Sequence, residues 1–140
     1  MSKPTFVGFQ EKIEIPDGYQ QLLIEDEIST TKDRDYLFSL LSEPQLISQW
    51  FVEIISLDSR PSGKVKIGNS SGQTTEAICT GFVLGKEVSM ISDGLGNFSG
   101  KVIKGRQENT IKISFSILTD APDQKREEIR GYINRLRALL

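Results

Sequence analysis

The clearest pattern in this chain is an apolar stripe near its C-terminal end. Between residues 120 and 140, apolar side chains recur at steps of three and four, the spacing of one face of an α-helix. The stripe consists of Ile129, Tyr132, Ile133, Leu136, Leu139 and Leu140. Burying each such side chain stabilises a fold by about 1.5–3 kcal/mol. The pattern therefore predicts a long helix over Asp120–Leu140 that docks on an apolar surface.

Upstream of this helix, apolar and polar positions alternate with a period of two, which is typical of strands buried on one face. Turn signals rich in glycine, proline, asparagine and aspartate divide the region into short strands. They are predicted over Tyr19–Ser29, Phe51–Asp58, Gly63–Ile67, Thr74–Leu84, Glu87–Ser92, Asn97–Arg106 and Thr110–Leu118. The turns are short, so we expect a curved antiparallel sheet of six to seven strands.

Two short helices are predicted between the first and second strands. Thr30 or Thr31 can cap the first helix, and Pro44 suits the first turn of the second. Trp50 shares the inner side of the second helix. Residues 1–18 carry several apolar side chains between prolines and glycines, which favours a short extra strand or flap as an N-terminal extension of a single domain over residues 1–140.

Composition excludes several classes of protein. A net charge of −2, from 17 basic and 19 acidic residues, gives no electrostatic reason to bind nucleic acid. No apolar run has the length of a membrane span, and Met1–Gln10 lacks a signal pattern, so we expect a cytoplasmic protein. The single Cys79 cannot form an internal disulfide, and we expect it to be buried and inert.

The chain contains no histidine. This excludes Ser-His-Asp and Cys-His nucleophile systems and the usual metal sites that contain histidine. The acidic residues are scattered and lack the spacing of a calcium loop. We therefore expect no metal and no cofactor, and we assign no catalytic residue.

The order strand, two short helices, six strands and long C-terminal helix resembles the helix-grip fold. This is the fold of the START-like, or SRPBCC, superfamily, which includes the birch-pollen allergen and the polyketide cyclases. Local motifs are similar to those of the branch named after activators of the heat-shock-protein-90 ATPase. They are Glu43-Pro44 with Leu46 and Trp50 (one residue more than the usual spacing), the turn Arg60–Lys64, Gly81-Phe82-Val83 and Gly131-Tyr132.

The resemblance implies an α+β fold with a ligand-sized cavity between the last helix and the sheet. Candidate lining residues are Trp50, Phe82, Met90, Phe98, Ile113 and Phe115 from the sheet side, and Ile129, Tyr132, Ile133 and Leu136 from the helix. Ordinary core packing explains the same residues, because apolar sites and cores use the same side chains.

Asp26 is the charged candidate among the ligand-binding residues. Strict alternation places it on the face of Ile24 and Ile28, where a carboxylate could orient a polar ligand group or act as a base. The alternatives are that the strand twists outward there or carries a bulge. Lys104 and Arg106 are candidate partners of Asp26 in the first interpretation.

Three hypotheses of function follow. The leading one is a non-enzymatic protein that binds a small hydrophobic or amphiphilic molecule. The second is a cyclase- or hydratase-like enzyme in which Asp26, Glu76 or Tyr132 supplies acid–base chemistry. The third is a protein-interaction module, linked to chaperones in the family as a whole, although the family name does not imply that role for a single domain.

Overall fold

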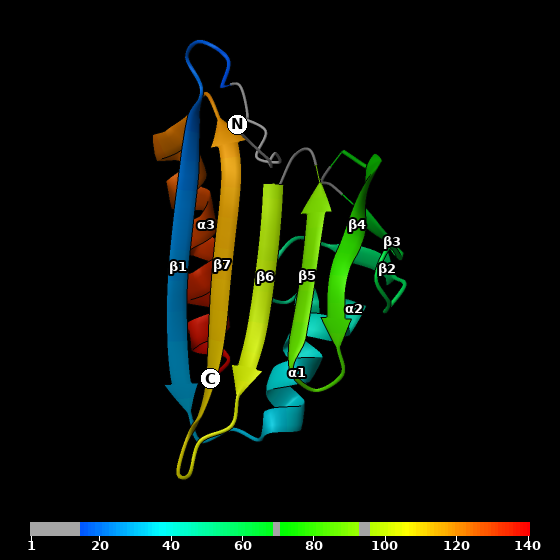
Figure 1. The fold of residues 1–140 in the computed structure, drawn as a ribbon, viewed down its shortest axis with the longest axis vertical. Coiled ribbons are helices and arrows are strands. Elements are labelled where there is room, and N and C mark those ends of the chain that lie inside the picture. The colour runs from blue at the N-terminus through cyan, green and yellow to red at the C-terminus, as the bar shows by residue number, and fades with distance from the viewer. Residues whose placement is uncertain (1–14, 69–70, 93–95) are drawn as a thin grey trace, which may run out of the picture.

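The alternating segments of the sequence form one antiparallel sheet in the computed structural model, which describes residues 15–68, 71–92 and 96–140. The strands are β1 (Gln20–Thr30), β2 (Ile54–Leu57), β3 (Lys64–Gly68), β4 (Thr74–Val83), β5 (Glu87–Ser92), β6 (Gly96–Ile103) and β7 (Asn109–Thr119). Their order across the sheet is β1-β7-β6-β5-β4-β3-β2. The first strand along the chain thus pairs with the last, and the other strands form a meander (Figure 1).

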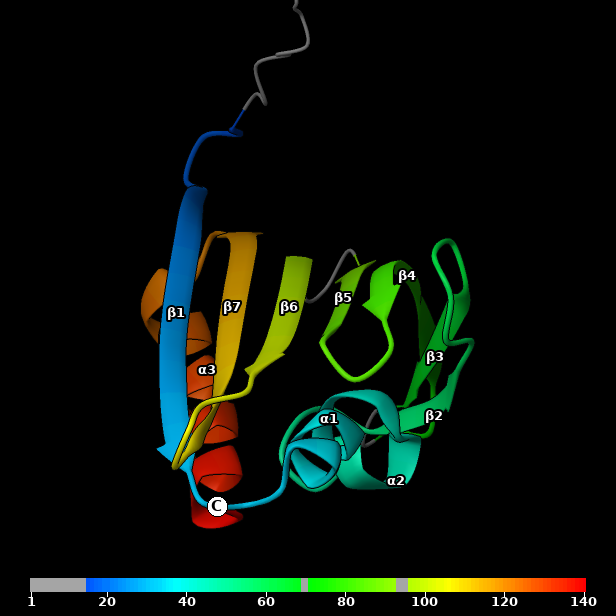
Figure 2. The same ribbon diagram turned by 60° about the horizontal axis from the view of Figure 1, so that its bottom comes forward.

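The helices all lie on one side of the sheet. They are α1 (Arg34–Ser42), α2 (Pro44–Ile47) and α3 (Pro122–Ala138). Figure 2 shows α3 along β1 and β7, whereas α1 and α2 cover the other half, toward which β3 and β2 curve. The predicted α+β helix-grip architecture is confirmed, with seven strands and a long C-terminal helix.

The register of β1 and β7 decides which side chains face the helices. The two strands pair without a shift from Gln20↔Thr119 to Thr30↔Asn109. Leu22 and Ile28 of β1, and the odd-numbered residues of β7 from Ile111 to Thr119, are buried toward the helices. The odd-numbered residues of β1 and the even-numbered residues of β7 lie on the opposite, outer face, which Figure 1 shows toward the viewer.

The helices pack closely on this inner face. In β6, Gly100 leaves room for α1, because a side chain there would come within 2.6 Å of Leu41 Cδ2. On α3, the predicted stripe is confirmed for Ile129, Tyr132, Ile133 and Leu136, which are all buried. Leu139 and Leu140 follow the end of the helix and are half-buried.

Three local predictions were wrong. The second strand begins at Ile54 and not at Phe51, because the chain continues in helix-like turns after α2, with Phe51 N–H donating to the Ile47 carbonyl at 2.8 Å. The sixth strand ends at Ile103 instead of Arg106, because Gly105 N–H donates to Asn109 Oδ1 at 3.3 Å in the turn that follows.

The third wrong prediction concerns the cap of α1. The N-cap is Asp33, whose side chain accepts from Asp35 N–H. Thr30 is instead the last residue of β1, and its hydroxyl donates to the Leu140 carbonyl at 3.3 Å. Of the predicted N-terminal extension, residues 1–14 lie outside the described residues, and Tyr19 N–H closes a turn on the Pro16 carbonyl at 3.0 Å.

The docking of α3 leads to a first prediction. Leu136 is fully buried, so Leu136→Asp places an unpaired charge in the core and should lower the free energy of unfolding by more than about 4 kcal/mol. Arg126→Ala on the exposed face of the same helix removes only a surface pair with Asp123 and should cost less than about 0.5 kcal/mol. Urea unfolding of both variants measures the difference, and similar midpoints would show that α3 does not stabilise the domain.

Candidate functional site

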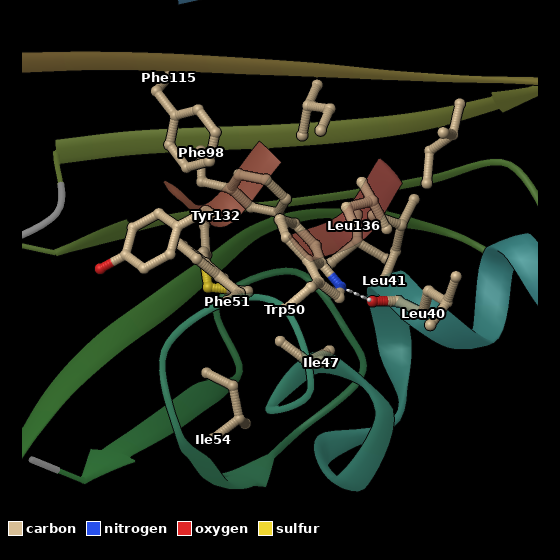
Figure 3. Close-up of a cluster of buried hydrophobic side chains, with 14 of the residues drawn as sticks. Leu40, Leu41, Ile47, Trp50, Phe51, Ile54, Phe98, Phe115, Tyr132 and Leu136 are labelled. Atoms are coloured by element: carbon tan, nitrogen blue, oxygen red, sulfur yellow. Dashed lines mark hydrogen bonds between the residues drawn. The ribbon is translucent and has the colours of Figure 1, made fainter. Parts of the chain in front are cut away.

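Five aromatic side chains meet between α3 and the sheet. They come from four parts of the chain: Trp50 and Phe51 from the segment after α2, Phe98 from β6, Phe115 from β7 and Tyr132 from α3. We call these five residues the aromatic cluster (Figure 3). Each is at most 8% exposed, and together they lie in the part of the interior where the sequence predicts a cavity.

Phe51 lies at the centre of the aromatic cluster. Its ring centroid is 5.1 Å from Trp50, 4.9 Å from Phe98, 5.6 Å from Phe115 and 5.0 Å from Tyr132. It stacks on Trp50 and meets Tyr132 edge to face. Such aromatic pairs contribute about 0.5–1.5 kcal/mol each beyond their buried area. One side chain therefore joins the sheet, α3 and the segment after α2.

Trp50 is held by a hydrogen bond as well as by packing. Its indole Nε1–H donates to the Leu40 carbonyl of α1 at 2.7 Å, as Figure 3 shows. The side chain is fully buried. A buried indole needs such a partner, because an unmade hydrogen bond there would cost about 1–3 kcal/mol. Trp50 thus links α1 to the aromatic cluster in a fixed orientation.

Tyr132 carries a polar group out of the aromatic cluster. Its hydroxyl points away from the other rings (Figure 3) and donates to Glu128 Oε2 at 3.3 Å. Glu128 also pairs with Lys125 Nζ at 2.9 Å, and the Arg135 guanidinium lies 5.4 Å from the centre of the Tyr132 ring. Burial, and then the charge of Glu128, raises the pKa of Tyr132 to about 12. The hydroxyl therefore remains a donor across the physiological range.

The other predicted lining residues lie around the aromatic cluster. Met90, Ile113, Ile129, Ile133 and Leu136 are buried on the inner face. Phe82 is half-buried on β4 and meets Phe38 of α1 edge to face, at 5.6 Å between ring centroids. The structure thus gathers the apolar candidates into one interior, and Phe51 is the member that the sequence did not predict. The sequence counted Phe51 only as the first residue of the predicted strand Phe51–Asp58, and its place beside Trp50 was the one signal of its role.

Asp26 lies apart from the aromatic cluster, at the edge of the sheet. The register with β7 places it opposite Ile113 with no bulge. Its Oδ2 accepts from Arg137 Nη2 at 2.9 Å, and its Oδ1 accepts from Glu27 N–H at 2.8 Å. The partner is therefore Arg137 of α3, and not Lys104 or Arg106. The carboxylate, 39% exposed, ties the end of α3 to β1.

Among the described residues, the other side chains that could be reactive or could bind a metal ion lie in ordinary structural positions. Cys79 is buried, its Sγ lies 3.4 Å from the Gly81 carbonyl, and burial raises the pKa of its thiol. Among the described residues, no group of three or more acidic or cysteine side chains is placed to hold a metal ion. Nor is any helix of the described chain long and apolar enough to cross a membrane.

Several solved structures share this fold. A protein from Nitrosomonas europaea is 17% identical, with a TM-score of 0.61 over 90% of this chain and 96% of that one. The Aha1 dimer from Colwellia psychrerythraea is 13% identical, with a TM-score of 0.66 over 84% and 92% of the two chains. CalU16 from Micromonospora echinospora is 10% identical, with a TM-score of 0.59 over 84% and 83%.

These likenesses show the fold, which is of the helix-grip type. At sequence identities of 10–17%, these structures give no information about the activity of this protein. No protein-family model matches the sequence, and no curated protein matches it either.

The environment of Tyr132 gives a second prediction. Its pKa is raised in the folded state to about 12, so between about pH 10 and 12 the folded protein holds a proton that the unfolded chain has lost. The stability from this group is complete below about pH 10 and should be lost as the pH rises to 12. We expect Tyr132→Phe to flatten the fall in melting temperature over that range relative to wild type. Tyr19→Phe, at an exposed site, is the control, and an equal effect of both variants would contradict the assignment.

Proposed function

We propose that this protein binds a small hydrophobic or amphiphilic molecule between α3 and the sheet, without catalysing a reaction. The observation that carries the proposal is the aromatic cluster itself. Five large rings from four parts of the chain converge under α3, and ligand sites are lined predominantly by such side chains. A helix-grip fold places this interior between one long helix and a curved sheet, where movement of a single segment would open it.

The segment that carries Phe51 is the part best suited to move. Residues 48–53 form neither helix nor strand, whereas Phe98, Phe115 and Tyr132 are held in regular elements. If the Phe51 ring swings out, an apolar ligand of similar size takes its place against the remaining rings. The bound ligand would then regain the contacts that Phe51 makes in the closed state. The free energy needed to displace the Phe51 ring is therefore part of the free energy of ligand binding.

The polar end of such a ligand would meet the Tyr132 hydroxyl and Glu128 at the rim. Glu128 is about half exposed, so it can exchange its contacts for a ligand group at low cost. This arrangement favours an amphiphile, with an apolar body among the rings and a polar end near α3. The motif Glu43-Pro44 with Trp50, and the likeness to the Colwellia Aha1 structure, support placing the chain in the Aha1-like branch. The single unpaired Cys79 supports a reducing compartment such as the cytoplasm.

Binding of an apolar fluorescent probe tests the site directly. We expect anilinonaphthalene sulfonate to bind the folded protein with a Kd in the micromolar range, about −8 kcal/mol. Ile113→Trp adds bulk on the inner face and should weaken binding at least tenfold. Ser116→Trp adds the same bulk to the outer face of the same strand, where Ser116 contacts Gln21, and should leave binding unchanged. Circular dichroism confirms that each variant folds, and a folded wild type that binds no probe would identify the aromatic cluster as a closed core.

Truncation of the Phe51 side chain provides an independent prediction. Phe51→Ala should destabilise the domain by about 3–5 kcal/mol, the cost of removing a buried ring. It should also tighten binding of the same probe by tenfold or more, because no ring must be displaced first. Ile55→Ala, in the adjacent strand but exposed, should change neither quantity by much. A folded Phe51→Ala variant that binds no better than wild type would contradict the displacement of Phe51.

A second candidate function is an enzyme of the cyclase or hydratase kind, which the contact of Tyr132 with Glu128 favours. Two polar side chains within hydrogen-bond reach at the rim of an apolar interior could transfer protons. The carboxylate of Glu128 is about half exposed, so it is accessible from solvent. Native mass spectrometry of freshly purified protein distinguishes the two functions. A bound molecule whose mass stays constant indicates a binding protein, and one that wild type converts but Tyr132→Phe does not indicates an enzyme.

A further inference from the structure

The outer face of the sheet holds a groove that is separate from the interior under α3. Its volume is about 550 Å³, and the outward-facing side chains that line it are those of Glu25, Glu27, Ser99, Lys101, Lys112 and Ser114. These residues belong to β1, β7 and β6, on the face that Figure 1 shows toward the viewer. A volume of this size is within the range of small-molecule sites.

Four hydrogen-bond donors lie together in this groove. Ser99 stands opposite Ser114, and two residues along the same strands Lys101 stands opposite Lys112. The four side chains therefore form a two-by-two array on β6 and β7, with two hydroxyls and two ammonium groups. Neither serine hydroxyl has a hydrogen-bond partner among the described residues. The array is thus open to an acceptor from outside the protein.

The two ammonium groups differ in how they are neutralised. Lys112 pairs with Glu27 at 3.7 Å. Lys101 stands opposite Glu87 in the register of β5 and β6, yet no ion pair within the described part of the chain includes it. Since Lys112 is already paired, Lys101 carries the unbalanced positive charge of the array. An anionic group bound beside Lys101 would balance this charge.

A matching negative charge lies on the other side of the serines. Glu25 of β1 stands opposite Ser114, and it has no ion-pair partner among the described residues. One unpaired carboxylate and one unpaired ammonium group therefore flank a pair of hydroxyls. Because β7 separates β1 from β6, their strands are about 10 Å apart, and both side chains can lean over the groove. An extended dipeptide spans about 7 Å, which suits the gap between two such leaning groups.

We propose that this groove binds a small zwitterion of dipeptide size. Its anionic end contacts Lys101, Lys112 and the hydroxyls of Ser99 and Ser114, and its cationic end contacts Glu25. The requirement for both charges follows from the composition of the groove, in which Lys112 and Glu27 already neutralise each other. A simple anion would gain from the lysines but would be repelled by Glu25, and a simple cation would be repelled by Lys101.

An NMR titration of the full chain with glycylglycine tests the proposal. We expect saturable shifts of the amides of residues 99, 101, 112 and 114, with a Kd of about 1 mM or tighter. Acetate and methylammonium, which each carry one of the two charges, should bind more weakly than glycylglycine. The affinity should also fall between low and physiological salt, because the charges in the groove are exposed.

Matched variants identify the groups involved. Lys101→Met and Glu25→Gln should each weaken glycylglycine binding by about fivefold, the effect of one partly exposed charge contact. Lys66→Met and Glu76→Gln change a lysine and a glutamate that face each other on β3 and β4, outside the groove, and should leave the affinity unchanged. The proposal is overturned if glycylglycine gives no saturable shifts, if acetate alone binds as tightly, or if the control variants weaken binding equally. None of these results depends on the apolar interior, so the binding site under α3 is tested separately.

Discussion

The contact of Phe51 with four other rings is the interaction on which the rest of the structure depends. The helices cover the inner face in two halves, with α3 over β1 and β7 and the α1–α2 pair over the other side. Phe51 lies where the two halves meet and contacts rings from both the sheet and α3. The neighbouring Trp50 donates a hydrogen bond to the Leu40 carbonyl of α1. A rearrangement of this one segment would therefore disturb the packing of the sheet, of α3 and of α1.

The pairing of the first strand with the last places a second demand on the fold. β1 is an edge strand of 11 residues, and long exposed edges favour unwanted pairing with other chains. Three consecutive acids, Glu25-Asp26-Glu27, lie at its middle and oppose a second copy of the same edge through like-charge repulsion. Asp26 also forms an ion pair with Arg137, and the Thr30 hydroxyl donates a hydrogen bond to the Leu140 carbonyl. These two interactions hold the C-terminal end of α3 and the residues after it against β1.

The two faces of the sheet have different chemical characters. The inner face is apolar and covered by the helices, and a ligand in the site proposed there would displace a side chain that already contributes to stability. The outer face is polar and already open, so a ligand in the groove needs no rearrangement, but it competes with water for every contact. We therefore expect slower exchange for the site under α3 and weaker, salt-dependent binding for the outer groove.

The sequence by itself determined the elements, because periodicity reports which side of each element is buried. The alternation of Ile111, Ile113 and Phe115 and the stripe from Ile129 to Leu136 both gave the inner face correctly. Local rules also placed Pro44 at the start of α2. These signals act between residues close in sequence, so they can be read without knowledge of the fold.

Only the tertiary structure decided how distant residues meet. Alternation placed Asp26 on the inner face, but the approach of α3 supplied Arg137 as its partner, 111 residues away. The sequence placed Phe51 at the start of a strand, whereas its burial results from the convergence of β6, β7 and α3 around one turn. The array of Ser99, Ser114, Lys101 and Lys112 arises in the same way from the register of β6 and β7. Strand register and helix docking are set by the packing of the whole core, and no local pattern records them.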